Sequence, residues 1–296
     1  MRVLPLAGRF LRRPASASPA ATAAAVAGAR RFTAAAPPPP LLHVRQPVAP
    51  SLRRCAVRFL STAMSDQHRR PALRPALFVC DMQEKFRHAI FEFDKVVLTT
   101  RKLLRAAALL DIPVFVTTQN RARLGDTVPE LAALYAAATA AGPDAAGVEA
   151  KGTTTARLVV DADKTRFSMW TPDVEAAFQR HVVAAATSAG PSAVPAVVLV
   201  GIEAHICVTQ TALDLLAAGH RVYVLADGVS SCNCEEVGIA LARLRAAGAV
   251  VTTSESWLYE HLGDAAVPTF RGMVGLVKET SADTRTALSA LLSPKI

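Results

Sequence analysis

A strand, a helix and a second strand are predicted in close succession within residues 197–227 of this chain. The sequence reads VVLVGIEAHICVTQTALDLLAAGHRVYVLAD, with a sharp turn at Gly201 and a helix beginning near Cys207. Two strands joined by a helix run parallel, and parallel sheets need cover on both faces, so this pattern indicates a layered α/β fold. A helix start offers unpaired N–H groups and the positive end of the peptide dipole, which favour a thiolate. Cys207 is therefore the first candidate nucleophile.

The same alternation runs through the chain from residue 75 onward. Strands are predicted at 76–81, 112–118, 156–163, 196–201, 221–227 and 249–253, and helices at 94–110, 171–186, 205–218, 233–247, 254–262 and 267–278. The stretch 128–150 is predicted as a short helix followed by a surface insertion, and 281–296 as a polar tail. Six strands alternating with helices predict a doubly wound three-layer α/β/α sandwich with a six-stranded, mainly parallel sheet.

The basic charge of the chain is confined to its N-terminal leader. The formal net charge is +9, but residues 1–65 contain ten arginines and no acidic residue, which leaves about −1 for residues 66–296. A near-neutral body argues against nucleic acid as a partner. A disordered leader rich in Arg, Ala, Ser and Pro is typical of organellar transit peptides. We expect mitochondrial targeting, with plastid import, a plain disordered extension, or a cytoplasmic form starting at Met64 as alternatives.

The cysteine pattern predicts neither disulfides nor a metal site. Five cysteines without regular spacing argue against a disulfide framework. Cys232 and Cys234 form a C-x-C that lacks the second ligand pair of a zinc site. No segment has 18 uninterrupted apolar residues with suitable flanks, so no membrane-spanning helix is expected.

Three chemically matched side chains fall at predicted strand ends. Asp81 ends the first strand, Lys164 follows the third and Cys207 follows the fourth. Active sites of doubly wound folds lie at the carboxyl ends of the strands. An ammonium favours a thiolate, and a carboxylate can accept the thiol proton and later activate water. Each residue alone also has a structural explanation, as a turn cap, a surface charge or a small core side chain.

Four segments carry a family resemblance over roughly residues 73–280. They are LFVCDMQEKFR (77–87), ADKTRFSMW (162–170), VGIEAHICVTQTALDLLAAGHRVYVLADGVSS (200–231) and ALARLRAAGAVVTTSES (240–256). The domain that contains these segments resembles the isochorismatase-like cysteine hydrolases. Within that family it is most similar to the isochorismatase domain-containing proteins, some of which are mitochondrial, and the resemblance implies a hydrolase domain.

The resemblance implies roles for particular residues. It implies a catalytic triad of Asp81, Lys164 and Cys207, and a non-proline cis peptide bond at Ile202–Glu203 that aims the N–H groups of Glu203 and Cys207 into an oxyanion hole. It places Phe86 against the substrate, and Gln83 and Gln119 are further pocket candidates. No cofactor is implied, and relatives often form homo-oligomers.

Two departures narrow the chemistry. Relatives that hydrolyse nicotinamide carry a D-x-H metal site after the second strand, where this chain reads TTQNRARLGD (117–126) without histidine. Relatives acting on isochorismate generally lack the cysteine, because a vinyl ether needs a general acid rather than a nucleophile. The combination favours acyl chemistry on a small amide-like substrate.

The remaining candidates have mainly structural interpretations. His205 is expected at the pocket rim or a subunit contact. Asp227, with Ser230 and Ser231, is expected to shape the turn after the strand at 221–227. Trp170, beside Met169, is predicted to line the pocket as a substrate-binding residue, and Cys80 to be an inert core residue. Two hypotheses remain beside the hydrolase: a catalytically silent module that binds a partner protein, and, more remotely, a nucleic-acid enzyme.

Overall fold

The computed structural model describes residues 72–135, 155–190 and 193–292, and in them one sheet with the strand order β3-β2-β1-β4-β5-β6. The strands are β1 (Ala72–Cys80), β2 (Val114–Gln119), β3 (Leu158–Lys164), β4 (Ala193–Ile202), β5 (Arg221–Ser230) and β6 (Val250–Thr252). Every pairing is parallel. The doubly wound sheet predicted from the sequence is confirmed, and its strand order reverses between β1 and β4.

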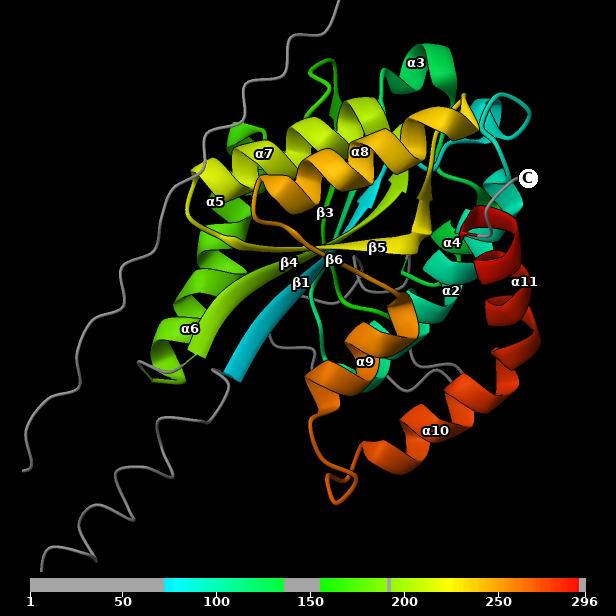
Figure 1. The fold of residues 1–296 in the computed structure, drawn as a ribbon. Coiled ribbons are helices and arrows are strands. Elements are labelled where there is room, and N and C mark those ends of the chain that lie inside the picture. Colours follow the sequence, from blue (N-terminus) through cyan, green and yellow to red (C-terminus); the bar gives the residue numbers. More distant parts are fainter. Residues whose placement is uncertain (1–71, 136–154, 191–192, 293–296) are drawn as a thin grey trace, which may run out of the picture. The chain divides into compact units, whose positions relative to one another are not determined.

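Helices cover the two faces of this sheet as separate layers (Figure 1). One layer holds α5 (Pro172–Phe178), the π-helical η3 (Gln179–Val183), α6 (Ala184–Ser188), α7 (Thr209–Ala217) and α8 (Cys234–Ala246). The other holds α2 (Phe93–Leu110), α9 (Ser254–Leu262), α10 (Phe270–Glu279) and α11 (Ser281–Leu292). Four short elements complete the described part: η1 (Glu84–Phe86), α3 (Arg121–Leu124), α4 (Pro129–Ala132) and the π-helical η4 (Ala204–Val208).

The central strands supply one hydrophobic core to each layer. Successive side chains of a strand point to opposite faces. In β1, Leu77 and Val79 therefore pack against the α2 layer, whereas Phe78 and Cys80 pack against the α7 layer. Because both faces are covered, the strands read as continuous apolar runs rather than as alternating ones.

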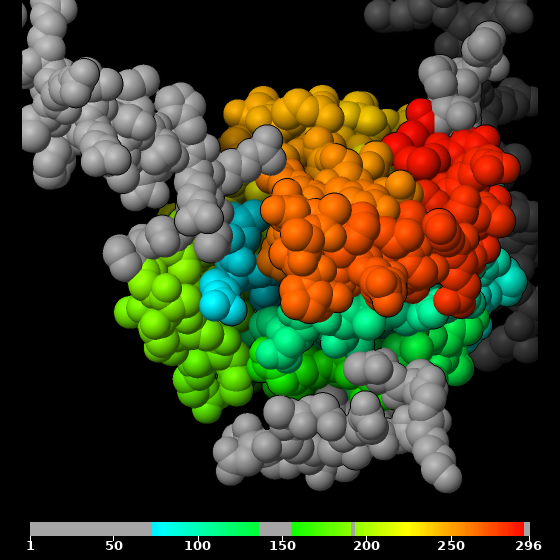
Figure 2. Space-filling view, turned by 90° about the horizontal axis from the view of Figure 1, so that it is seen from below, coloured from blue at the N-terminus to red at the C-terminus, as the bar shows by residue number. Residues whose placement is uncertain are grey.

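The C-terminal segment corrects the prediction of a polar tail at 281–296. Residues 281–292 form α11, which packs on α2, while 293–296 lie outside the described residues. Figure 2 shows the C-terminal helices, coloured orange to red, side by side on one face of the molecule. Thr284 and Ala287 are buried one helical turn apart, and Thr284 Oγ1 accepts a hydrogen bond of 2.9 Å from the buried Lys102 Nζ. Two small buried residues, Thr284 and Ala287, and the hydrogen bond from Lys102 therefore hold this helix against α2.

Some predictions fall on residues that are not described. The leader 1–65 lies outside them, as does most of the surface insertion predicted within 128–150, which begins after the described helix α4. All the described residues belong to one unit, Met64–Ile296. Among the helices described, none combines the length and apolar character that crossing a membrane requires.

Candidate active site

A buried ion pair joins the ends of two strands that are not neighbours in the sheet. Asp81 follows β1, Lys164 ends β3, and β2 lies between these strands. Lys164 Nζ is 2.7 Å from Asp81 Oδ2, and the two side chains are only 1% and 2% exposed. The other carboxylate oxygen, Oδ1, accepts a hydrogen bond of 2.8 Å from Thr117 Oγ1 on β2. Side chains from β2 and β3 therefore fix the carboxylate at the end of β1.

The Lys164 ammonium is held in place by further oxygen acceptors. Besides Asp81 they are Gln119 Oε1 at 2.8 Å, Phe167 O at 2.9 Å and Arg166 O at 3.1 Å. Burial lowers the pKa of Lys164, but electrostatic interactions with Cys80, Asp81 and Cys207 and the hydrogen bond to Asp81 outweigh burial and raise it above its ordinary value. The site therefore contains a fixed positive charge.

Cys207 enters the same cluster from β4. It lies in η4, directly after the strand-to-helix turn, and is 5% exposed. It lies close enough to Cys80 to raise the pKa of that thiol, and Cys80 Sγ lies 3.6 Å from Asp81 Oδ2. The three residues predicted from the strand ends thus lie in one cluster with Cys80 at the carboxyl edge of the sheet.

Cys80 is buried in the core as predicted, but its neighbours were not predicted from the sequence. Its thiol lies beside both Cys207 and Asp81. Burial, the hydrogen bond to Cys207 and the charge of Asp81 raise the pKa of Cys80 well above its ordinary value. It therefore remains a neutral thiol that can donate a hydrogen bond. Strand periodicity gives the face on which Cys80 lies but does not reveal which residue across the sheet meets it.

The turn between β4 and η4 corrects a second prediction. The resemblance implied a cis peptide bond at Ile202–Glu203, but no cis peptide bond occurs in the described residues. The chain turns instead through positive φ angles at Gly201 (129°) and Glu203 (55°). Backbone N–H groups at positions 206 and 208 then bond back to the Glu203 carbonyl and close the π-helical turn that holds Cys207.

Gly201 is required by both its backbone angle and its surroundings. A Cβ atom there would lie 2.2 Å from the Cys80 carbonyl oxygen and 2.7 Å from Cys80 Cβ. We expect Gly201→Ala to lower the free energy of unfolding by about 3 kcal/mol or more, because strain and overlap add. Gly238→Ala is the matched control: Gly238 lies on the exposed side of α8 with nothing near its missing Cβ, so alanine should stabilise by about 0.5–1 kcal/mol. Urea unfolding of both variants checks this, and equal midpoints would contradict it.

The predicted substrate-binding residues have different surroundings in the structure. Gln83 is fully buried. Its side-chain amide forms hydrogen bonds with the backbone of Gln119 and Gly125, and so holds the end of β2 and the segment that follows against the segment after β1. Gln119 reaches the site directly through Lys164 and bonds the Thr165 carbonyl with its amide nitrogen. Phe86 is half-buried in η1 and packs on the core beneath α2.

Trp170 lies in the core rather than on a pocket wall. Its ring centroid is 5.5 Å from that of Phe178, 5.4 Å from that of His220 and 6.5 Å from that of Phe78. Phe167, by contrast, is 52% exposed, and its carbonyl oxygen accepts a hydrogen bond from the Lys164 ammonium. In the sequence, its position three residues after Lys164 could have identified it as an aromatic residue near the site.

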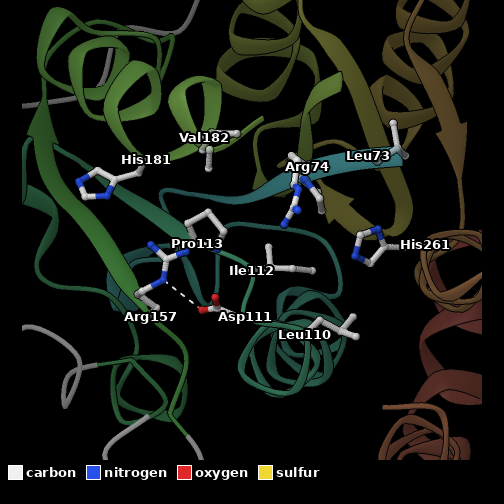
Figure 3. Close-up of a pocket in the computed structure, with 12 residues that line it drawn as sticks. Leu73, Arg74, Leu110, Asp111, Ile112, Pro113, Arg157, His181, Val182 and His261 are labelled. Atoms are coloured by element: carbon white, nitrogen blue, oxygen red, sulfur yellow. Dashed lines mark hydrogen bonds and ion pairs between the residues drawn. The ribbon is translucent and has the colours of Figure 1, made fainter. Parts of the chain in front are cut away.

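A pocket of about 140 Å³ lies at the opposite edge of the sheet (Figure 3). Leu73 and Arg74 from the start of β1, Pro113 before β2 and Arg157 before β3 contribute to its wall. Arg157 Nε pairs there with Asp111 Oδ1 at 3.2 Å. Because catalytic groups of doubly wound folds gather at the carboxyl ends of strands, this pocket is separate from the candidate active site.

The remaining residues singled out in the sequence also find partners. Asp227 accepts a hydrogen bond of 2.7 Å from the backbone N–H of Ser254 and one from its hydroxyl, so it fixes the start of α9. Ser230 Oγ donates to the Phe91 carbonyl. His205 Nδ1 lies 3.0 Å from Ser231 Oγ.

Comparison with known proteins gives a consistent family. Residues 75–256 match the family model of the isochorismatase domain. The chain is 39% identical over 203 residues to the secreted isochorismatase effector Isc1 of Phytophthora sojae, covering 69% of this chain and 84% of that protein. It is 38% identical to isochorismatase domain-containing protein 2 of Xenopus laevis (70% and 85% covered) and to isochorismatase domain-containing protein 1 of Salmo salar (70% and 62% covered).

Solved structures agree with the fold. The MAR1 ribonuclease of Caenorhabditis elegans is 34% identical, with a TM-score of 0.59, over 77% of this chain and 98% of that one. The YcaC gene product of Escherichia coli, described as an octameric hydrolase of unknown specificity, shares the fold at 22% identity and a TM-score of 0.53, over 73% of this chain and 92% of that one.

Proposed function

Since the chain belongs to the isochorismatase domain family, which has hydrolase members, we propose that it is a cysteine hydrolase for small amide-like substrates. Asp81, Lys164 and Cys207 would act together. The observation that carries the proposal is the buried Asp81–Lys164 pair, which lies in one cluster with the Cys80 and Cys207 thiols at the carboxyl edge of the sheet. Buried charges are costly unless paired, so a paired carboxylate beside two thiols is typical of a functional site.

The proposed reaction has two covalent stages. Asp81 takes the thiol proton of Cys207, and the thiolate forms a C–S bond to the carbonyl carbon of the substrate. The C–N bond then breaks, and the leaving amine takes the proton from Asp81. Water next attacks the thioester and gives a proton to Asp81. The C–S bond then breaks, a carboxylic acid leaves, and Asp81 returns its proton to the Cys207 sulfur.

Two groups would stabilise charge during this reaction. The Lys164 ammonium would stabilise the negative charge that develops on the Cys207 sulfur during attack, since the two groups lie in one cluster. The backbone N–H groups of Glu203 and Cys207 are proposed to bind the oxyanion of the tetrahedral intermediate, at about 3 kcal/mol per donor. Every step uses groups of the chain itself, so the mechanism requires no cofactor.

Thiol reactivity tests the proposal without knowledge of the substrate. Treated with limiting iodoacetamide near neutral pH, the full chain should be alkylated at Cys207 faster than glutathione under the same conditions. Cys80 should stay unmodified, because it is fully buried and its pKa is raised. Cys232, exposed and also with a raised pKa, provides the slow internal reference. Peptide mapping by mass spectrometry assigns each adduct, and labelling of Cys207 no faster than glutathione would favour the silent binding module.

The substrate itself calls for a direct screen. Primary amides and ureido acids are the proposed class, and intact mass would detect the covalent acyl adduct. RNA belongs in the same screen, because one relative is named a ribonuclease. A charge of about −1 for residues 66–296 gives that polyanion little to bind, so we expect no RNA cleavage above background. Ribonuclease activity lost in Cys207→Ala would replace the amide proposal.

Assembly and location complete the proposal. We propose a homo-oligomer, in keeping with the family resemblance and with the octameric YcaC hydrolase, and size-exclusion chromatography with light scattering would test it. The composition of residues 1–65 supports import into mitochondria, with a plastid or a cytoplasmic form from Met64 as alternatives. Fusing residues 1–65 to a fluorescent protein would distinguish them.

A further inference from the structure

Three side chains of metal-ligand type meet beside the turn that carries Cys207. They are Glu203, His205 and Cys232, and their ligand atoms all lie within 4.8 Å of one another. The first two belong to the turn after β4, and Cys232 follows β5, the next strand of the sheet. No metal was predicted from the sequence, because spacing pairs Cys232 only with Cys234 and does not reveal a partner 29 positions earlier.

The group is already linked by polar contacts. Glu203 Oε2 lies 3.4 Å from His205 Nδ1 and accepts a hydrogen bond of 3.3 Å from the backbone N–H of Cys232. The hydroxyl of the buried Ser231 lies 3.0 Å from His205 Nδ1 and restricts the orientation of the ring. The three ligand groups therefore converge without rearrangement of the backbone.

The exposure of the group suits an entering ion. The side chains of Glu203 and His205 are 16% and 23% exposed, whereas Cys232 is exposed. The ligands are thus partly ordered by burial, with one side open to solvent. An isolated acidic cluster would not discriminate between cations, but a set of one thiolate, one imidazole and one carboxylate does.

We propose that Glu203, His205 and Cys232 bind a divalent zinc ion. Zinc accepts sulfur, nitrogen and oxygen ligands together in tetrahedral geometry. Bonds of about 2.0–2.3 Å place neighbouring ligands roughly 3.3–3.8 Å apart, a spacing that side chains now within 4.8 Å of one another reach by small rotations. Cys232 loses its thiol proton to solvent on binding, and the fourth position remains for water. This site lies after β4 and β5, away from residues 117–126 after β2, and the inference holds whether or not the chain is a hydrolase.

Zinc binding by the full chain tests the site. Protein freed of metal with a chelator would be dialysed against zinc chloride, and bound zinc measured by mass spectrometry. We expect one zinc per chain, and with Co²⁺ a sulfur-to-cobalt charge-transfer absorption that reports a thiolate ligand. Cys232→Ser and His205→Gln should each weaken zinc binding by at least about 10-fold. The matched control is Cys234→Ser, which changes a thiol two positions away and should bind like the wild type.

Two further measurements keep the result unambiguous. Cys207→Ser should retain zinc and the cobalt absorption, because Cys207 is not a proposed ligand. Zinc should raise the thermal midpoint of the wild type and of Cys234→Ser but not that of Cys232→Ser, whose midpoint without metal should match the wild type. Absence of bound zinc in the wild type would overturn the proposal. So would unchanged binding in a folded Cys232→Ser, or loss of the cobalt absorption only in Cys207→Ser.

Discussion

Cys207→Ala is expected to lower kcat by at least about 10⁴-fold on any amide substrate that the chain hydrolyses, because no other group in the mechanism can form the thioester. The same variant should show no acyl adduct by intact mass. Its free energy of unfolding should change by only about 1 kcal/mol, since a small buried side chain is replaced by a slightly smaller one. Steady-state kinetics and urea unfolding measure the two quantities on the same preparation.

Cys80→Ala is the control that separates the nucleophile from its neighbour. Both thiols lie in the same hydrophobic cluster and touch each other, so the two substitutions remove the same atom from nearly the same place. Cys80 donates a hydrogen bond but forms no covalent bond, so its loss should cost about 10- to 100-fold in kcat. Full turnover in Cys207→Ala, or equal losses in the two variants, would refute the assignment.

The sequence predicted that Asp81, Lys164 and Cys207 lie together, and parallel topology is the reason. Once strands are predicted to end at Asp81, at Lys164 and just before Cys207, a parallel sheet brings these ends to one edge whatever the details of packing. Sheet order was not needed for that conclusion. The same reasoning could not reveal Cys80, whose contact with Cys207 depends on how closely Gly201 lets β4 approach β1.

Other differences also have physical causes. Trp170 follows Lys164 by six residues, but its ring turns back into the aromatic cluster around Phe178, a tertiary preference that spacing does not encode. The tail that forms α11 is polar on average, and its few buried positions become informative only when α2 is there to receive them. The group of Glu203, His205 and Cys232 depends on β4 and β5 being adjacent, and no motif spacing reports that adjacency.

Breaking the Asp81–Lys164 pair from one side should cost far more stability than removing it entirely. Lys164→Met leaves the Asp81 carboxylate buried without a countercharge, with the Thr117 hydroxyl and the weakly donating Cys80 thiol as neutral donors. An uncompensated buried charge lowers the free energy of unfolding by about 3–5 kcal/mol. In the double variant Asp81→Asn/Lys164→Met, neither side chain is charged, and we expect most of that loss to be recovered. Urea unfolding of the wild type, the single variant and the double variant measures the difference.

Activity should not follow stability in this series. If the pair serves catalysis, Lys164→Met and the double variant both lose turnover by several orders of magnitude, because the base or the fixed positive charge is missing in each. Iodoacetamide labelling of Cys207 should slow in both as well, since the ammonium that favours the thiolate is gone. If the pair only holds the strand ends together, the stable double variant should regain turnover and Cys207 labelling along with its fold. That recovery would remove Asp81 and Lys164 from the mechanism.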